Sequence, residues 1–403
     1  MLIFRALYHR NYRLFFFGQT VSLIGTWMQQ IAVTWLVYRL TQSPVLLGTV
    51  GFLSMFPSFI LTPFAGVFSD RWSRYRILLF TQTISMVQAL AMAVLVLAGF
   101  EQVWPILFLT LVLGCVSAVD MPVRHAFVSD MVEHRGDLGY VIAMNSAIFN
   151  FARLIGPSVA GFLIAWTGEG VCFLINGLSY IAVIAALCSM RLVVTTPAGE
   201  GQGIIRELLD GLAYAFHDRK IRAILLLMAL GGTLGIPYVT IMPVYASEIL
   251  HGGPRTLGLL MSAIGAGALM GALYFAWKPP HKRLMQIIPL AMGGVGLGFV
   301  GLAVCRSIPL ALCFMFLAGL GMVFHFAASN TEIQTIVEES KRGRVVSLLI
   351  FSVMGMLPFG SLLAGALTEV MNIQWVFLMG GVGCLVGAGI FVLRAKKAGV
   401  HLM

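Results

Sequence analysis

Long apolar runs alternate with short polar segments along almost the whole chain. About 20 apolar residues in an α-helix cross the hydrocarbon core of a bilayer, whereas a membrane β-barrel uses alternating segments of about ten residues. The continuous runs seen here therefore predict an all-α membrane protein with twelve transmembrane helices. The predicted spans are 14–38, 45–67, 77–99, 105–130, 140–166, 171–191, 221–248, 256–277, 285–305, 308–337, 344–370 and 375–394.

The longest polar segment, residues 192–220, separates six predicted spans from the other six. It begins with a stretch rich in glycine and continues into a charged amphipathic stretch at 204–216, which predicts a cytoplasmic linker with a helix lying on the membrane surface. The predicted domains are an N-terminal six-helix bundle at 1–191, the linker at 192–220 and a C-terminal six-helix bundle at 221–403.

Two short motifs recur in the two halves. Residues 43–48 (SPVLLG) correspond to 253–258 (GPRTLG), and residues 155–163 (IGPSVAGFL) correspond to 359–367 (FGSLLAGAL). The offsets of 210 and 204 residues agree to within the variation of a loop. Duplicated halves are typical of secondary transporters, in which the substrate site lies between the halves near the bilayer midplane. We therefore expect two pseudo-symmetric bundles.

Composition and charge agree with a membrane protein of fixed orientation. The chain is 59% hydrophobic, has a mean hydropathy of +0.93 and is only 10% charged, whereas soluble domains are about a quarter charged. With the N-terminus in the cytoplasm, 21 of the 26 Lys and Arg residues lie on the cytoplasmic side, and only Arg39, Arg255 and Arg306 lie outside. This positive-inside pattern places both termini in the cytoplasm. It also accounts for the net charge of +10 without a nucleic-acid partner.

No pattern in the chain indicates catalysis. The six cysteines are scattered within predicted spans at no metal or redox spacing, which predicts packing residues rather than disulfides. There is no phosphate-binding G-x-x-x-x-G-K-[ST] loop and no metal-spaced His/Cys cluster. We expect neither an enzyme nor a cofactor or metal site.

Residues 66–76 (GVFSDRWSRYR) place four charges and a glycine in a turn between two apolar runs. This loop, the twelve spans and the central linker resemble the major facilitator superfamily. Finer features are similar to the branch that holds bacterial macrolide-efflux and enterobactin-exporter proteins. These features are the Trp27–Gln30 motif, residues 120–128 (DMPVRHAFV) and the Gly156-Pro157 pair.

The same loop suggests a gate. Gly66 allows close helix approach, and Asp70 can face the positive N-terminal end of a neighbouring helix, which in the superfamily is the eleventh span. Arginines at 71, 74 and 76 can pair with acids that end span four. The candidate gating residues are Gly66, Asp70, Arg71, Arg74, Arg76 and Asp130. One interpretation is a latch that holds the cytoplasmic side shut, and the other is charge that only sets topology. The corresponding second-half segment, 276–283, lacks the glycine and the aspartate, so the gate would be asymmetric.

Ionisable residues within spans are expensive and are therefore functional candidates. Asp120 lies in span four, Arg124 follows one turn later on the same face, and Arg153 lies at a similar depth in span five. Asp120 either carries the coupling proton or is a permanently ionised partner of Arg124 or Arg153. His325, midway along span ten, is the second proton-coupling candidate because imidazole ordinarily titrates near neutral pH, and its alternative role is packing.

The resemblance implies a cavity lined by spans one, four, seven and ten. Aromatic and amide side chains there suit a bulky amphiphile better than a sugar or an inorganic ion. The alternative is that some of these rings face lipid or pack between helices. The substrate-binding candidates are Arg153, Arg124, Gln19, Trp27, Gln30, Asn150, Tyr238, Phe324 and Asn330.

Together these features predict a proton-coupled exporter of a small amphiphilic molecule, such as a siderophore or drug, that works by alternating access. The resemblance implies a multi-pass protein, active as a monomer, in the bilayer of a bacterial cytoplasmic membrane. Its partners would be the small-molecule substrate, protons and lipid. A lipid or lysolipid flippase of the same fold is the first alternative. A non-transporting membrane receptor is more distant, because the loops are short.

Overall fold

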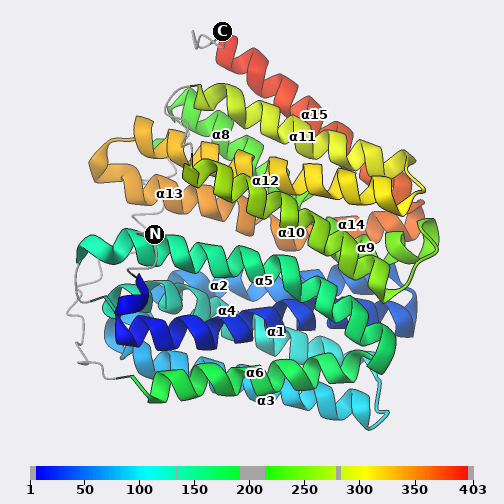
Figure 1. The fold of residues 1–403 in the computed structure, drawn as a ribbon. Helices are drawn as coiled ribbons and strands as arrows, with labels where there is room; N and C mark the ends of the chain where they lie inside the picture. Colours follow the sequence, from blue (N-terminus) through cyan, green and yellow to red (C-terminus); the bar gives the residue numbers. More distant parts are fainter. Residues whose placement is uncertain (1–5, 133–134, 191–213, 216, 278–282, 398–403) are drawn as a thin grey trace. The chain divides into compact units, whose positions relative to one another are not determined.

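The computed structural model describes residues 6–132, 135–190, 214–215, 217–277 and 283–397, without the side chains of 62–71, 129, 135, 276, 340 and 395–397. Most of the predicted linker therefore lies outside the described residues. Every element in the described ranges is helical (Figure 1), which confirms the all-α prediction. A backbone in lipid must satisfy its own hydrogen bonds, and a helix does so within one segment.

Contacts between Cα atoms divide the chain into two compact units. The first unit comprises Met1–Gln42, Leu53–Gly201 and Gly253–Ser262, and the second comprises Ser43–Phe52, Gln202–Gly252 and Ala263–Met403. The start of the second helix thus belongs to the second unit, and the start of the helix at 254 belongs to the first. The predicted domain boundaries at 191 and 221 stay a prediction.

The first unit is built around α1, which packs against α5 and α6, while α3 packs against α4 and α6 (Figure 1). The end of this unit that is predicted to face the cytoplasm contains an apolar cluster that includes Tyr12, Phe15 and Phe127. The Tyr12 hydroxyl donates a hydrogen bond to the Val141 carbonyl at 3.2 Å. The helices are α1 (Arg10–Thr41), α2 (Pro44–Arg71), α3 (Arg74–Leu97), α4 (Val103–Asp130), the short 3₁₀ helix η2 (Arg135–Asp137), α5 (Leu138–Thr167) and α6 (Glu169–Cys188).

The second unit is built around α11, which packs against α12 and α15, while α8 packs against α13 and α15. Asp218 begins α8, because its carboxylate accepts the backbone N–H groups of Lys220 and Ile221 at 2.7 and 3.0 Å. The helical segments are α8 (Arg219–Leu230), η3 (Gly231–Gly235), α9 (Tyr238–Val244), η4 (Tyr245–Ile249), α10 (Pro254–Trp277), α11 (Leu284–Val304), α12 (Ile308–Ile336), α13 (Glu339–Met354), α14 (Leu357–Val370) and α15 (Ile373–Lys397).

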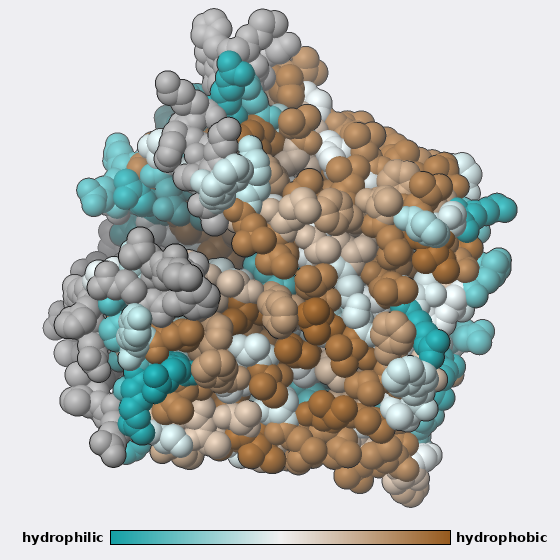
Figure 2. All heavy atoms as spheres, in the orientation of Figure 1, coloured by the Kyte–Doolittle hydropathy of each residue, from teal (hydrophilic) through white to brown (hydrophobic). Residues whose placement is uncertain are grey.

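Eleven helical segments within the described residues are long and apolar enough to cross a membrane. The remaining predicted span, α1, has sufficient length at 32 residues but not the apolar window, because glutamines, serines and threonines are spread along it. Figure 2 shows apolar residues over much of the visible surface. Large side chains such as Phe108 and Leu290 are 64% and 78% exposed. A soluble protein would bury so much apolar surface, so these faces fit lipid.

Two predicted spans are interrupted helices rather than continuous ones. The span at 221–248 consists of α8, the π-helical turn η3, α9 and the second π-helical turn η4. The glycines at 231, 232 and 235 and Pro237 occur at the first interruption, and both residue types weaken a regular α-helix. The span at 344–370 breaks between α13 and α14, just before Pro358. In contrast, α4 continues as one helix through Pro122.

The repeated motifs meet in two helix crossings, one in each unit. In the first unit, a Cβ atom placed on Gly258 of α10 would lie 3.0 Å from the Cα atom of Gly161 in α5. In the second unit, a Cβ atom on Gly365 of α14 would lie 2.9 Å from the Cα atom of Gly48 in α2. In the first unit, the motif at 253–258 therefore contacts the motif at 155–163. In the second unit, the motif at 43–48 contacts the motif at 359–367. Small residues at both crossings let the two backbones approach closely.

Candidate functional site

Asp120 is the centre of a buried polar network between α3 and α4. Its side chain is almost fully buried, and its three hydrogen-bond partners among the described residues are all donors. Arg124 Nη2 lies 2.5 Å from Asp120 Oδ2, one helical turn away. The Thr81 hydroxyl and the Gln82 amide donate to Asp120 Oδ1 at 2.7 and 2.8 Å. The carboxylate of Asp120 thus accepts hydrogen bonds from α3 and from its own helix α4.

Arg153, the other predicted partner of Asp120, lies elsewhere in the first unit. Its guanidinium lies over the Trp27 ring, with Cζ 5.9 Å from the ring centroid, and Trp27 contacts Phe149 edge-on at 5.8 Å. A guanidinium over an aromatic face is a favourable cation–π arrangement. The structure therefore brings Asp120 together with Arg124, and Arg153 together with Trp27.

A second buried network joins α1, α3 and α6 through amide side chains, and it was not identified from the sequence. Gln29 donates to Gln88 Oε1 at 2.9 Å, Asn176 donates to Gln29 Oε1 at 2.6 Å, and Gln88 donates to the Leu109 carbonyl at 3.1 Å. The sequence feature that could have indicated this network is the presence of an amide side chain within each of three apolar spans. Paired buried amides fix the relative register of the helices that carry them.

The other substrate-binding candidates are spread over both units. Gln19 is buried, and its Oε1 atom makes no hydrogen bond within the described residues, while Gln30 is partly exposed. Asn150 donates to the Ser146 carbonyl within its own helix at 2.9 Å.

In the second unit, these candidates contact neighbouring side chains. The Tyr238 ring packs against Phe299, with 5.6 Å between ring centroids. Phe324 packs against the ring of Phe275 with 4.9 Å between centroids. Asn330 Oδ1 accepts a hydrogen bond from the Gln334 amide at 3.2 Å.

His325, the second proton-coupling candidate, is buried in the second unit. Its Nδ1 atom lies 3.2 Å from the Ile288 carbonyl oxygen of α11. Among the described residues, those that line the pocket beside it include no carboxylate. A protonated imidazole in this position would have no counter-ion in that pocket, which favours a neutral ring.

The gating loop is described only in part. Gly66, Asp70 and Arg71 belong to the last turns of α2, but their side chains lie outside the described residues. Arg74 Nη1 lies 3.0 Å from Asp130 Oδ1, so the start of α3 is paired with the end of α4. Arg76 is exposed. The role of these residues as a latch stays a prediction.

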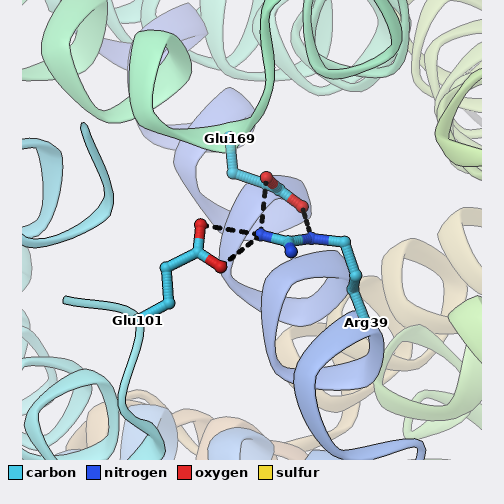
Figure 3. A network of polar contacts seen from close by, with 3 residues as sticks. All are labelled: Arg39, Glu101 and Glu169. Atoms are coloured by element: carbon cyan, nitrogen blue, oxygen red, sulfur yellow. Dashed lines mark hydrogen bonds and ion pairs between the residues drawn. The ribbon is translucent and has the colours of Figure 1, made fainter. Parts of the chain in front are cut away.

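An ion cluster lies where α1 ends and α6 begins, and Figure 3 shows its three residues. Arg39, in the last turn of α1, contacts Glu169 Oε1 through Nε at 2.8 Å and Glu101 Oε1 through Nη2 at 2.9 Å. Glu169 is the first residue of α6 and is buried. Each charge suits its helix end, because a C-terminus favours a cation and an N-terminus favours an anion. The cluster therefore joins α1, α6 and the loop before α4.

Replacing Arg39 by alanine is expected to destabilise the protein. The change leaves the buried Glu169 carboxylate beside Glu101 with no cation between them, at a cost of about 2 kcal/mol, between the values for buried and for exposed pairs. Thermal unfolding in detergent measures the effect. Glu101→Gln is the matched control and should cost less, because Arg39 keeps its bond to Glu169. Equal unfolding temperatures for Arg39→Ala and the unmodified protein would contradict this role.

Among the described residues, no three His, Cys, Asp or Glu side chains lie together as metal ligands. All six cysteines are free.

Comparison with known proteins agrees with this organisation. A family model described as "Transmembrane secretion effector" matches residues 3–399. The staphyloferrin A transporter of Staphylococcus aureus is 25% identical over 389 residues, which cover 95% of this chain and 96% of that protein. Macrolide efflux protein A of Streptococcus pyogenes is 22% identical over 391 residues, which cover 93% of this chain and 94% of that protein.

A solved structure of a POT family transporter, in complex with a thioalcohol conjugated peptide, shares the fold with a TM-score of 0.76. The match covers 96% of both chains at 11% sequence identity. The predicted resemblance is thus confirmed, and so is the fold class. The chain belongs to the transmembrane secretion effector family, which consists of major facilitator transporters and not of enzymes.

Proposed function

We propose that this protein is a proton-coupled exporter of a small amphiphilic molecule of the siderophore or drug type. The observation that carries the proposal is Asp120, a carboxylate that is 3% exposed within a membrane-spanning helix and is paired with Arg124. An ionisable residue at such a position is costly and by default functional in a transporter.

The Asp120 network offers a means of coupling. A proton that binds Asp120 must compete with Arg124, because the guanidinium of Arg124 is hydrogen-bonded to the same carboxylate. Protonation would weaken the Asp120–Arg124 pair within α4 and the hydrogen bonds that Thr81 and Gln82 of α3 donate to the same carboxylate, which would change how α4 is held by α3. Energy from proton binding would thereby act on helix packing, as a transporter that alternates between two states requires.

The nature of the cargo is inferred from relatives and from the first unit. Two relatives are named for a siderophore and for macrolides. Trp27, Phe149 and Arg153 form an aromatic and cationic group that would suit a molecule with a flat apolar part and an anionic part. The expected orientation has both termini in the cytoplasm and places the protein in a bacterial cytoplasmic membrane.

Flux into proteoliposomes tests the proposal. Purified protein is reconstituted in vesicles with an acidic lumen, and siderophores, macrolides and lysolipids are screened for accumulation inside. A siderophore or macrolide should accumulate, and nigericin, which collapses the proton gradient, should abolish that accumulation. Flux of lysolipid alone, independent of the gradient, would favour a flippase. Absence of gradient-driven flux for every compound with folded protein would overturn the proposal.

A further inference from the structure

A small pocket inside the second unit contains a histidine that the proposed transport mechanism does not use. The pocket is lined by residues of η3, α8, α11, α12 and α13, including Gly231, His325 and three methionines. The methionines are Met228 of α8, Met292 of α11 and Met322 of α12. The π-helical turn at Gly231–Gly235 forms part of its wall, and such turns are frequent at functional sites.

The imidazole of His325 is held in an orientation that leaves Nε2 available. The Ile288 carbonyl can only accept a hydrogen bond, so Nδ1 carries the proton and Nε2 of the neutral ring is an acceptor. His325 is 95% buried, at 5% exposure, and Nε2 has no hydrogen-bond partner within the described residues. The Leu227 carbonyl also lies near the ring, but a carbonyl cannot donate a hydrogen bond to the unprotonated Nε2.

The histidine and a thioether approach the same point in the pocket wall. A Cβ atom placed on Gly231 would lie 4.0 Å from His325 Cδ2, the carbon bonded to Nε2, and 3.9 Å from Met292 Sδ. Glycine at 231 therefore leaves open the space between the Nε2 edge of the ring and this sulfur. Met228 and Met292 are almost fully buried, so their sulfurs are also shielded from water.

The donor set identifies the ligand. One imidazole nitrogen and three thioether sulfurs are all electron-pair donors, and no carboxylate is found among the described residues that line the pocket. Thioethers select soft metals such as Cu(I), whereas Mg²⁺ and Ca²⁺ require oxygen ligands. Histidines that bind metals ordinarily donate their other ring N–H to a carbonyl or a carboxylate, as His325 does to Ile288. Water suits the space poorly, because it needs two to four polar partners.

We propose that this pocket binds a soft monovalent metal ion, Cu(I) in the cell, through His325 Nε2 and the thioethers of Met228, Met292 and Met322. The ion would connect α8, α11 and α12 within the second unit. Sequence patterns did not indicate this site, because methionines in apolar spans are indistinguishable from packing residues. The proposal does not depend on the direction or cargo of transport.

Silver nitrate is the probe, because Ag(I) is a soft monovalent ion that needs no reductant. Thiols also bind it, so full-length protein with all six cysteines replaced by alanine is titrated by calorimetry, after its secondary structure and thermal unfolding have been checked. One equivalent should bind. His325→Gln and Met292→Leu should each weaken binding at least about tenfold. Met92→Leu, at a buried methionine of α3 in the first unit, is the matched control and should change nothing.

Methyl NMR of the cysteine-free protein provides an independent measurement. With ¹³C-methyl methionine, one equivalent of Ag(I) should shift the resonances of Met228, Met292 and Met322 but not that of Met92. Ag(I) binding that is unchanged in Met292→Leu would mean that the ion is not held by the thioether of Met292, and would overturn the proposed site. Absence of binding to the cysteine-free protein, together with unshifted methyl resonances, would overturn it as well.

Discussion

Replacing Asp120 by asparagine is expected to lower proton-driven transport at least tenfold, a loss equivalent to about 1.4 kcal/mol in the free energy of activation. Asparagine keeps an oxygen that can accept the hydrogen bonds from Thr81 and Gln82. It removes the charge that pairs with Arg124 and the site at which a proton can compete with that arginine. Flux in proteoliposomes at several lumenal pH values measures the effect, and the residual flux should lose its dependence on pH.

The same substitution leaves Arg124 without its anion. The Arg124 side chain is 23% exposed, so it is partly hydrated, and we expect a loss of about 2–3 kcal/mol in stability. Asp120→Asn combined with Arg124→Gln should recover much of this stability without recovering coupling. Such a result separates a role in transport from a role in folding, because stability requires only that no unpaired charge is left, whereas coupling requires the carboxylate itself.

Glu338→Gln is the matched control for loss of a carboxylate. Glu338 is exposed and pairs with Lys341 at 3.6 Å on the surface of the second unit. Removal of such a pair changes stability by less than about 1 kcal/mol, and we expect transport to be unchanged. If Asp120→Asn transported as well as Glu338→Gln with the same pH dependence, Asp120 would be excluded as the coupling residue.

Most helix positions followed from apolar runs, because about 20 such residues in succession have few alternatives to a transmembrane helix. The predicted end of span four at Asp130 coincides with the end of α4. Hydropathy alone was less informative about whether α1 spans the membrane, because α1 carries polar side chains. One of them, the amide of Gln29, makes hydrogen bonds inside the first unit. The interruption between α13 and α14 lies just before Pro358, and it is this proline rather than the apolar run that indicates where the helix changes direction.

The partners of the polar residues were less predictable than the helices. Helical spacing placed Arg124 one turn from Asp120, but it could not decide between Arg124 and Arg153, because that choice depends on how α4 and α5 pack. The Arg39 cluster shows the same limit. Arg39, Glu101 and Glu169 are up to 130 residues apart in sequence, and only the packing of α1 against α6 brings them together. Tertiary contacts of this kind leave no local pattern.

Gly258→Ala and Gly365→Ala are each expected to destabilise the protein by about 2–3 kcal/mol, since overpacking a closely packed interior typically costs this much. A Cβ atom at Gly258 would lie 2.5 Å from the Pro157 carbonyl oxygen, and one at Gly365 would lie 2.5 Å from the Pro44 carbonyl oxygen. These neighbours are backbone atoms, so no rotation of a side chain can relieve the clash. The helices must separate instead. Thermal unfolding in detergent measures the loss.

Gly293→Ala supplies a control in which the sign should reverse. Gly293 lies within α11, and a Cβ atom there would meet nothing within 4 Å. Alanine is a better helix former than glycine by about 1 kcal/mol, so this variant should be unchanged or more stable. The same chemical change is thus expected to act in opposite directions at crossing and non-crossing glycines. If Gly258→Ala and Gly365→Ala behaved like Gly293→Ala, the repeated motifs would have to be retained for a reason other than close helix packing.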